Sequence, residues 1–333
     1  MSLPSLRCYL GSALLATTLL STAVEAVTLK VSHIRPQGAI IDMELKDFAD
    51  KVKKVTDGEV KIKIFAASAL GDYTTVQERI SVGAVDMAVQ PAATAASRKM
   101  QISAFPYIAE NWAQAHKIYG PGGAIHSAMK ELYAKQDITM LAAYPVYFGG
   151  VALNRAPVSA GDPSVKKGIK VRVPGIKSFQ LTSDALGYIS SPIPFSEAFT
   201  AVQTGVVDGI IGSGAEGYYA SFRDVTKTYI PVNTHFEVWY MIINSGTLAD
   251  MDDKARAALE KAALEFEKQR WVKAESDQTA YEQKLADYGA TIVSLTDAQL
   301  KAAAEKVRAE VWPQILKDVG EKWGQALLDK VSH

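Results

Sequence analysis

MDDKARAALEKAALEFEKQRWVKAESDQTAYEQKLADY, residues 251–288, contains neither glycine nor proline and keeps the apolar spacing of a helix. Asp250 can cap this helix, and the charges of Asp252 and Asp253 are favourable at the positive end of its dipole. Gly289 then ends it. At 1.5 Å per residue such a helix would extend roughly 55 Å, more than the width of a small domain. We therefore expect one helix lying across two lobes; the alternative is two helices joined by a bend that the sequence does not mark.

The length and composition of the chain fit two globular lobes. The chain has 333 residues, of which 48% are hydrophobic and 22% charged, and this length is too great for one ordinary core. Lysine plus arginine and aspartate plus glutamate both number 36, so the formal net charge is zero. The basic excess typical of nucleic-acid or membrane-surface binding is missing. Any preference for an anion must come from one local site.

The start of the chain has the pattern of a secretory signal peptide, residues 1–26. Arg7 gives a positive beginning, residues 10–20 are apolar and uncharged, and small residues up to Ala26 predict cleavage before Val27. An uncleaved anchor is the alternative, although the apolar run is short for a bilayer. We expect a periplasmic protein. Cys8 is the only cysteine, so the mature chain would have no disulfide and no thiolate.

Short apolar strands alternate with longer helical patterns in the rest of the chain. Residues 60–65 (VKIKIF) alternate between apolar and lysine side chains, as a half-buried strand does. Further strands are expected at 28–33, 170–173 and 239–244, and Ser196 is expected to cap a helix. This order predicts an α/β protein whose sheets are covered by helices.

Motifs of catalysis and metal binding are missing from the sequence. It contains no Gly-x-Ser-x-Gly and no His-Glu-x-x-His, and its five histidines do not pair at metal-ligand spacing. Ser213 lies in Gly-Ser-Gly without the frame of a nucleophile elbow. Residues 120–123 (GPGG) lack the Lys-Ser/Thr of a phosphate loop and are expected to break a helix. We expect a protein that is not an enzyme and holds no metal or organic cofactor.

One arginine stands near the end of an apolar strand. Residues 168–174 read GIKVRVP, in which Arg172 lies between two valines and a proline ends the strand. In α/β folds the ends of buried strands face the crevice where ligands bind. The guanidinium is always charged, and its fork of N–H groups matches a carboxylate. The residues alone leave two partners open, a ligand carboxylate or an acidic side chain of the protein itself.

Several segments together resemble the solute-binding proteins of tripartite ATP-independent periplasmic (TRAP) transporters, the DctP-like family. The matching segments are Val-Ser-His at 31–33, Ala-Leu-Gly-Asp at 69–72, Gly-Ala-Val-Asp-Met at 83–87, Phe-Pro-Tyr at 105–107 and the run from Lys170 to Gly209. The resemblance covers nearly the whole chain after the signal. It implies an α/β, two-lobed periplasmic-binding-protein fold with a hinge and a long helix crossing both lobes.

The resemblance also implies a function, partners and binding residues. Proteins of this family bind a small organic acid between their lobes and release it to the small and large membrane subunits of a TRAP permease. Arg172 would bind the ligand carboxylate and Phe195 would pack on the ligand, with core packing as the alternative for Phe195. No nucleic-acid partner is implied, and we expect a monomer. The expected division is residues 27–149 plus 238–277 in lobe I and residues 150–237 plus 278–333 in lobe II.

Two positions depart from the common pattern of that family. Gly149 stands where many members have a second arginine, and Gly212 stands where many have an asparagine. Fewer polar anchors and more room favour a monocarboxylate with an apolar, aromatic or hydroxylated body over a C4-dicarboxylate or sialic acid. The alternatives are a periplasmic enzyme, with Glu216, Glu237 or His235 as its base, and a ligand sensor.

Aromatic and amide side chains near these positions are further candidates for the cleft. Tyr147, Trp239 and Tyr218 could form its walls, with core or hinge packing as the alternative. Gln90 ends a strand and could donate to the ligand or bind backbone instead.

Three charged residues complete the candidates. Glu216 and Glu237 could meet an amine or hydroxyl of the ligand, but the simpler expectation is a solvated carboxylate for both. Arg35, in a loop after the first strand, could supply the missing second cation, but a surface position is the simpler expectation.

Overall fold

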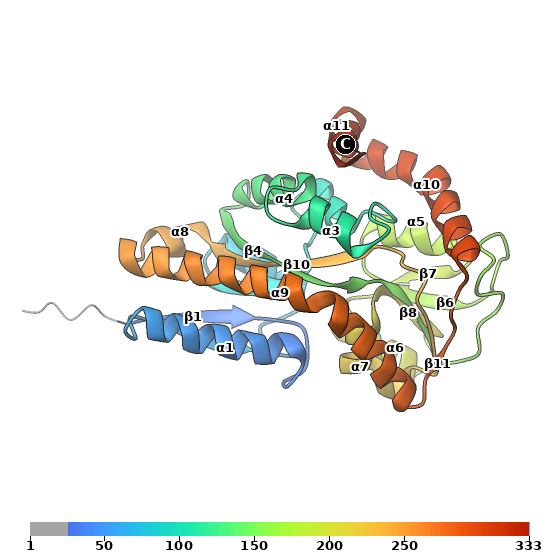
Figure 1. The fold of residues 1–333 in the computed structure, drawn as a ribbon, viewed down its shortest axis with the longest axis horizontal. Coiled ribbons are helices and arrows are strands. Elements are labelled where there is room, and N and C mark those ends of the chain that lie inside the picture. The colour runs from blue at the N-terminus through green and yellow to red at the C-terminus, as the bar shows by residue number, and fades with distance from the viewer. Residues whose placement is uncertain (1–25, 333) are drawn as a thin grey trace, which may run out of the picture.

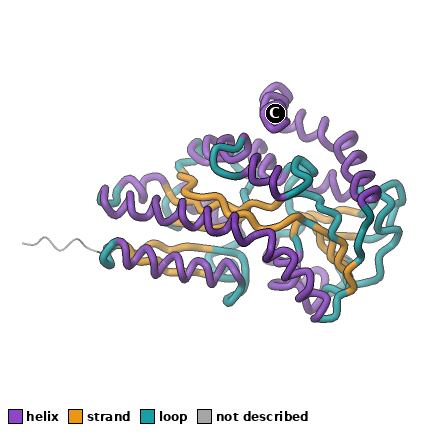
Figure 2. Tube along the Cα trace, in the orientation of Figure 1, coloured by secondary structure: helices purple, strands orange, loops and turns teal. Residues whose placement is uncertain are grey.

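The computed structural model describes residues 26–332. In it, helices cover two β-sheets (Figures 1 and 2). The first sheet has five strands in the order β2 (Val60–Phe65), β1 (Val27–Ser32), β3 (Met87–Gln90), β10 (Phe236–Asn244) and β4 (Ile138–Phe148). The second sheet has six strands in the order β11 (Thr291–Ile292), β9 (Thr228–Ile230), β5 (Gly150–Leu153), β8 (Gly209–Ser213), β6 (Lys170–Val173) and β7 (Ile189–Pro192). The expected α/β class is confirmed. The predicted signal peptide, apart from its last residue, lies outside the described residues.

The helices divide between the two sheets. Those beside the first sheet are α1 (Ile40–Val55), α2 (Tyr73–Ser81), η1 (Arg98–Ala104), α3 (Trp112–Tyr119), α4 (Ala124–Ala134) and α8 (Ser245–Ala249). Those beside the second sheet are α5 (Lys177–Ala185), α6 (Phe195–Gln203), α7 (Ala215–Phe222) and η2 (Arg223–Val225). After β11, α10 (Asp297–Val319) packs on α5 and η1, and α11 (Glu321–Ser332) packs on α10 and α4. No helix within residues 26–332 is both long and apolar enough to cross a membrane.

The strand predicted from strict alternation is the edge strand β2. Val60 is buried, whereas Lys61 and Lys63 are exposed. β2 pairs in parallel only with β1, so its other edge is free for solvent. Lysines on such an edge also discourage pairing with another chain.

The long helix expected at residues 251–288 is one helix, α9 (Asp253–Asp287). It runs beside both sheets and changes direction partway (Figure 1). Phe266 contacts Phe48 of α1 at 5.4 Å between ring centroids, and Tyr281 contacts Tyr219 of α7 at 5.7 Å. Because α9 stays helical through this change of direction, the alternative of two separate helices is wrong.

Two predicted helix caps were assigned to the wrong residues. Asp252 caps α9 by accepting the backbone N–H of Lys254 at 2.9 Å, because Asp250 already serves as the C-cap of α8. Ser196 lies inside the first turn of α6 and donates its backbone N–H to Asp72 at 3.3 Å. Each error moves a helix start by two residues and leaves the helix itself in place.

Buried polar side chains of α9 bind the backbone of β4. Glu267 accepts the N–H of Ala143 at 2.9 Å, and Arg270 donates Nε–H to the carbonyl of Pro145 at 2.9 Å. Pro145 has no N–H for the ladder, and the register between β4 and β10 is irregular here. The helix thus satisfies strand groups that the irregular ladder leaves free.

The chain passes between the sheets at residue 149, at residues 231–235 and along α9. At the first two crossings the backbones bind each other. Gly149 donates its N–H to the carbonyl of His235 at 2.8 Å, and Thr234 donates to the carbonyl of Gly149 at 2.9 Å. These bonds hold Gly149 and His235 at the junction of the sheets, next to the ends of β4 and β10.

Candidate ligand-binding cleft

A cleft lies between the two sheets, where loops and strand ends from both sides meet. The first sheet and its loops contribute Ile34, Arg35, Tyr73, Pro91, Ala92, Ser103, Ala104, Tyr147, Glu237, Val238 and Trp239. The second contributes Arg172, Pro174, Ile176, Phe179, Phe195 and Gly212. The cavity volume is about 30 Å³, which is room for no more than a few water molecules. Entry of a larger molecule therefore requires the two sides to separate or the lining side chains to move.

A larger hollow lies elsewhere on the molecule. It measures about 500 Å³ and lies between α3, α4 and α11. The charged residues that line it, Lys117, Glu131 and Lys330, are exposed, so this hollow offers no buried charge for recognition. The cleft between the sheets is the candidate site because its walls combine apolar side chains with buried charges.

Arg172 on β6 is a buried cation without an acidic partner. The residue is only 2% exposed, and its Nε–H donates to the carbonyl of Ile193 at 2.8 Å. Within residues 26–332 no carboxylate lies within 4.0 Å of its guanidinium nitrogens. The ring of Phe195 lies 5.8 Å from its Cζ. Burial lowers the pKa of Arg172 below its usual value, so the charge is held at a free-energy cost that an anion would reduce.

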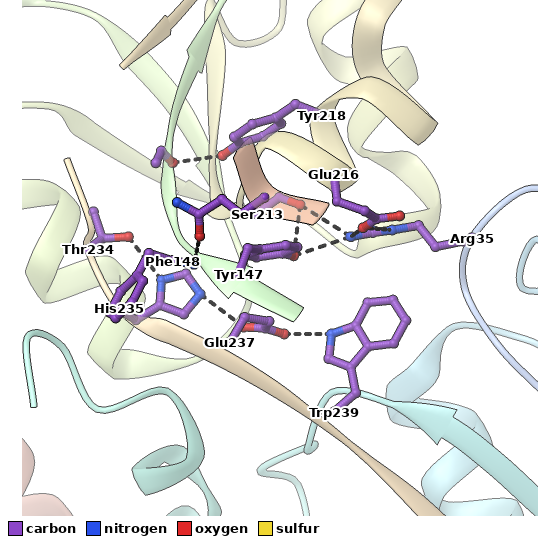
Figure 3. Close-up of polar contacts among 12 residues, drawn as sticks. Arg35, Tyr147, Phe148, Ser213, Glu216, Tyr218, Thr234, His235, Glu237 and Trp239 are labelled. Carbon is purple, nitrogen blue, oxygen red and sulfur yellow. Dashed lines mark hydrogen bonds and ion pairs between the residues drawn. The ribbon is translucent and has the colours of Figure 1, made fainter. Parts of the chain in front are cut away.

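Arg35 is a second buried cation in the same cleft, and Glu216 of α7 neutralises it. Nε and Nη2 of Arg35 both lie 3.0 Å from Oε2 of Glu216. Nη2 also donates to the hydroxyl of Tyr147 at 3.2 Å and to that of Ser213 at 3.4 Å (Figure 3). Burial disfavours the charge on Arg35, but Glu216 beside it holds the pKa above its usual value. The expectations of a surface Arg35 and a solvated Glu216 are therefore wrong.

Aromatic rings surround the Arg35 guanidinium. Its Cζ lies 4.9 Å from the ring centroid of Trp239 and 5.4 Å from that of Phe195. A guanidinium stacks favourably on such faces. Phe195 is the first residue of α6 and is only half-buried, and its ring meets that of Phe222 at 5.5 Å. It therefore touches both the cleft cations and the core of the second sheet.

Glu237 of β10 is a buried carboxylate that lines the cleft between His235 and Trp239 (Figure 3). Oε1 accepts the indole N–H of Trp239 at 2.8 Å, and Oε2 lies 2.9 Å from Nε2 of His235. Nδ1 of His235 lies 2.9 Å from the hydroxyl oxygen of Thr234. A neutral imidazole satisfies both contacts if Nε2 carries the hydrogen and the threonine hydroxyl donates to Nδ1. The expectation of a solvated Glu237 is wrong, because the residue is only 6% exposed.

Tyr73, at the start of α2, lines the cleft together with Arg172 and Glu237. Burial raises the pKa of its phenol above the usual value; the Arg172 charge lowers it, and the Asp72 and Glu237 charges raise it. Arg172 and Glu237 make no ion pair with each other within 4.0 Å in the described chain.

The two glycines that depart from the family pattern do not leave open space. A Cβ on Gly149 would stand 2.2 Å from Cε1 of His235. A Cβ on Gly212 would stand 2.6 Å from Cδ of Pro174, and the φ of +104° at this residue is itself unfavourable for a side chain. The extra room expected at these positions is thus filled by His235 and Pro174.

Two of the sequence candidates lie behind the walls of the cleft. Gln90 donates from Nε2 to the carbonyl of Tyr73 at 2.7 Å. The Tyr218 hydroxyl is 2.8 Å from the carbonyl of Gly150 and 2.9 Å from that of Ile210. Neither residue lines the cleft. Tyr147, Trp239, Phe195, Arg172 and Gly212 do line it, whereas Gly149 and Glu216 lie next to lining residues.

Several lining residues were not predicted, and their sequence contexts explain why. Tyr73 follows the Ala-Leu-Gly-Asp segment, Ser103 lies in η1, and Ile176 and Phe179 lie at the start of α5. They come from elements that are far apart in the sequence, and apolar residues in such places are equally typical of a core. Pro174 was noted in the sequence as the residue that ends the Arg172 strand, but not as part of the cleft wall.

Groups that could hold a metal ion were not found in this cleft or elsewhere in residues 26–332, where no set of three or more His, Cys, Asp or Glu side chains is suitably placed. The buried polar groups of the cleft instead form a guanidinium without an acid, a closed arginine–glutamate pair and an anchored carboxylate. Such a set is suited to binding a small polar molecule.

The family model for bacterial extracellular solute-binding protein, family 7 (DctP), matches residues 31–318. The chain belongs to this family. The C4-dicarboxylate-binding periplasmic protein DctP of Rhodobacter capsulatus is 27% identical to it over 92% of this chain and 94% of that protein. The resemblance stated from the sequence is confirmed.

Solved structures of TRAP solute-binding proteins have the same fold. A protein from Desulfovibrio salexigens with bound orotic acid superimposes with a TM-score of 0.82 at 21% identity, covering 92% of this chain and 97% of that one. The sugar acid binding protein DctPAm of Advenella mimigardefordensis, in complex with galactonate, gives 0.85 at 18% identity, covering 92% and 98%. These likenesses confirm the two-lobed fold with a long helix.

Proposed function

We propose that this protein is the extracytoplasmic binding component of a TRAP transporter and captures a small organic acid whose carboxylate binds Arg172. The observation that carries the proposal is a guanidinium buried in the cleft with no carboxylate within 4.0 Å in the described chain. A charge in such a place needs a counter-ion. Its fork of free N–H groups matches a carboxylate. The proteins named above bind acids, namely C4-dicarboxylates, orotic acid and galactonate.

The ligand in this proposal is a monocarboxylate with an apolar, aromatic or hydroxylated body. Glu216 already neutralises Arg35, so a second ligand carboxylate would meet no unpaired cation. At Gly149, where many members have another arginine, the space is filled by His235. The remaining walls are largely apolar, with Phe179, Phe195 and Trp239 among them.

Capture in this proposal is a hinge closure without chemical turnover. In this proposal lobe I is residues 27–149 plus 238–277 and lobe II is residues 150–237 plus 278–333, and the boundary after Glu237 falls inside β10. They would part at the crossings near Gly149 and close around the ligand. A monomer, exported with cleavage between Ala26 and Val27, would then deliver the acid to the small and large membrane subunits of the permease.

A thermal-unfolding screen of the mature chain with organic acids tests the proposal. A ligand present at 100 times its Kd adds about 2.7 kcal/mol to the free energy of unfolding. Arg172→Ala should weaken binding of each hit by roughly 2–5 kcal/mol, the usual effect of removing one member of a buried charge pair. Arg155→Ala is the matched control, because Arg155 is in the same region of the chain but its side chain is 54% exposed. Failure of every acid to stabilise the protein, or equal binding by Arg172→Ala, would sink the proposal.

A further inference from the structure

Besides the Arg35–Glu216 pair, two side chains of opposite charge line the cleft: Arg172, and Glu237, which is hydrogen-bonded to His235 and Trp239. Arg35 and Glu216 cancel each other at 3.0 Å. Arg172 then remains as a cation that binds only a backbone carbonyl, and Glu237 remains as a carboxylate. The two do not form an ion pair with each other within the described chain. Each is more than nine-tenths buried.

Glu237 is held in a fixed position but still has capacity to accept hydrogen bonds. Each of its oxygens has one partner, Trp239 Nε1 at 2.8 Å or His235 Nε2 at 2.9 Å. A carboxylate offers about four lone-pair sites, so about two remain. Glu237 lines the cleft, so its carboxylate is next to the space in which a ligand would lie. Side-chain hydrogen bonds link Thr234, His235, Glu237 and Trp239 in a row (Figure 3). They hold the carboxylate in position before a ligand arrives.

Arg172 and Glu237 come from opposite sides of the cleft. Arg172 is on β6 of the second sheet, and Glu237 is on β10 of the first, opposite Tyr147 of β4. Both residues line the same cleft, together with Tyr73. A ligand with a negative end and a hydrogen-bond-donating, positive end would therefore contact both sheets. A dicarboxylate would place its second anion against Glu237.

We propose that Glu237 is the specificity-determining residue of this site and selects an amino-acid-like, zwitterionic monocarboxylate, whose cationic nitrogen donates to Glu237 while its carboxylate binds Arg172. This inference rests on the function proposed above and narrows its ligand. Net charge supports it, since a zwitterion leaves the cleft neutral. A hydroxyl in place of the ammonium keeps the hydrogen bond but loses the attraction of opposite charges. The expected order of affinity is amino acid, hydroxy acid, plain acid and then dicarboxylate.

Two sets of linear acids test this order, because within each set only the far end changes. The four-carbon set is 4-aminobutanoate, 4-hydroxybutanoate, butanoate and succinate. The five-carbon set is 5-aminopentanoate, 5-hydroxypentanoate, pentanoate and glutarate. In calorimetry with the mature wild-type protein, we expect the amino member of at least one set to bind 10-fold or more tightly than its matched dicarboxylate. This measurement requires no variant to fold.

Variants assign the preference to Glu237. In Glu237→Gln the ratio of amino acid to dicarboxylate affinity should fall at least fivefold, since the amide keeps the shape but not the charge. Glu197→Gln, on the exposed face of α6, should leave the ratio unchanged. Arg172→Ala should lose binding of every acid. A dicarboxylate that binds as tightly as the amino member, no binding by either set at 10 mM, or an unchanged ratio in Glu237→Gln would overturn the role of Glu237. These outcomes leave the proposed function itself standing; it fails if no organic acid of the wider screen stabilises the protein or if Arg172→Ala binds the hits as tightly as wild type.

Discussion

Arg35 and Arg172 are both buried guanidiniums beside the ring of Phe195, yet their surroundings differ in one respect. Arg35 is 3.0 Å from Glu216 and has two hydroxyl acceptors. Arg172 has only the carbonyl of Ile193. The first arginine is satisfied by the protein and closes one side of the cleft. No carboxylate of residues 26–332 lies within 4.0 Å of the second arginine, so its charge is not neutralised by a protein side chain. Burial alone therefore does not distinguish the two arginines, whereas burial without an acidic partner supports the proposed role of Arg172 in ligand binding.

Stability should separate the two arginines most strongly. Arg35→Met leaves Glu216 buried without its cation, so the free energy of unfolding should fall by about 3–5 kcal/mol. Arg172→Met removes a buried charge that has no acidic partner, so the ligand-free protein should be unchanged or more stable. Urea unfolding of the two variants beside wild type makes the measurement. Equal losses in both variants would break the comparison.

A double-mutant cycle should show a smaller effect, the coupling between Arg35 and Glu216. Replacing both members of a buried ion pair by apolar residues is often nearly neutral, whereas breaking it leaves a bare charge. Arg35→Met/Glu216→Leu should therefore be more stable than the sum of the two single changes predicts, by roughly 1–3 kcal/mol. The same cycle with Arg172→Met and Glu216→Leu serves as the control and should be close to additive. Additive behaviour of the Arg35 cycle would contradict the pairing.

The smallest expected effect is on the pH dependence of stability, through His33. Burial lowers the pKa of His33, and the Arg35 charge adds to this, against Asp42, whose Oδ1 is 3.3 Å from Nε2. Between the ordinary pKa of about 6.5 and the lower folded value, the unfolded chain binds a proton that the folded protein does not. Stability should therefore fall as pH drops below about 6.5, by less than about 1.4 kcal/mol per pH unit for one proton.

The two arginine variants should change this slope differently. Without the Arg35 charge the folded pKa of His33 rises toward its ordinary value, so Arg35→Met should lose less stability between pH 7 and pH 5 than wild type does. Arg172 is not among the main influences on the pKa of His33, so Arg172→Met should stay close to the wild-type slope. Urea unfolding at several pH values measures both. A steeper slope in Arg35→Met would contradict the assignment.

Local patterns in the sequence predicted the elements well and their ends less well. The glycine- and proline-free run gave α9, and the alternation at residues 60–65 gave β2, because each signal depends on periodic burial alone. The caps at Asp250 and Ser196 were misplaced, since several adjacent residues can serve as a cap and packing chooses among them. The capping box of α10, Thr296 with Gln299, is a signal of the readable kind, because both of its members lie within one turn.

The site was predicted less completely than the fold. Arg172 was identified because strand, proline and family pattern all fall within a few residues. Arg35 and Glu216 were taken for surface residues because 181 positions separate them and nothing local marks a pair. Gly149 and Gly212 suggested open space, but the side chains that fill it belong to His235 and Pro174.

The sequence by itself determined that this is an α/β chain with one long helix and that Arg172 ends a buried strand. These properties follow from spacing along the chain, and short-range periodicity fixes them. Only the tertiary structure decided which buried charges are paired, because pairing depends on distances of a few ångströms between residues that folding brings together. That difference separates Arg35 from Arg172. It also shows that Glu237, an ordinary acidic residue in the sequence, is a hydrogen-bonded residue that lines the cleft.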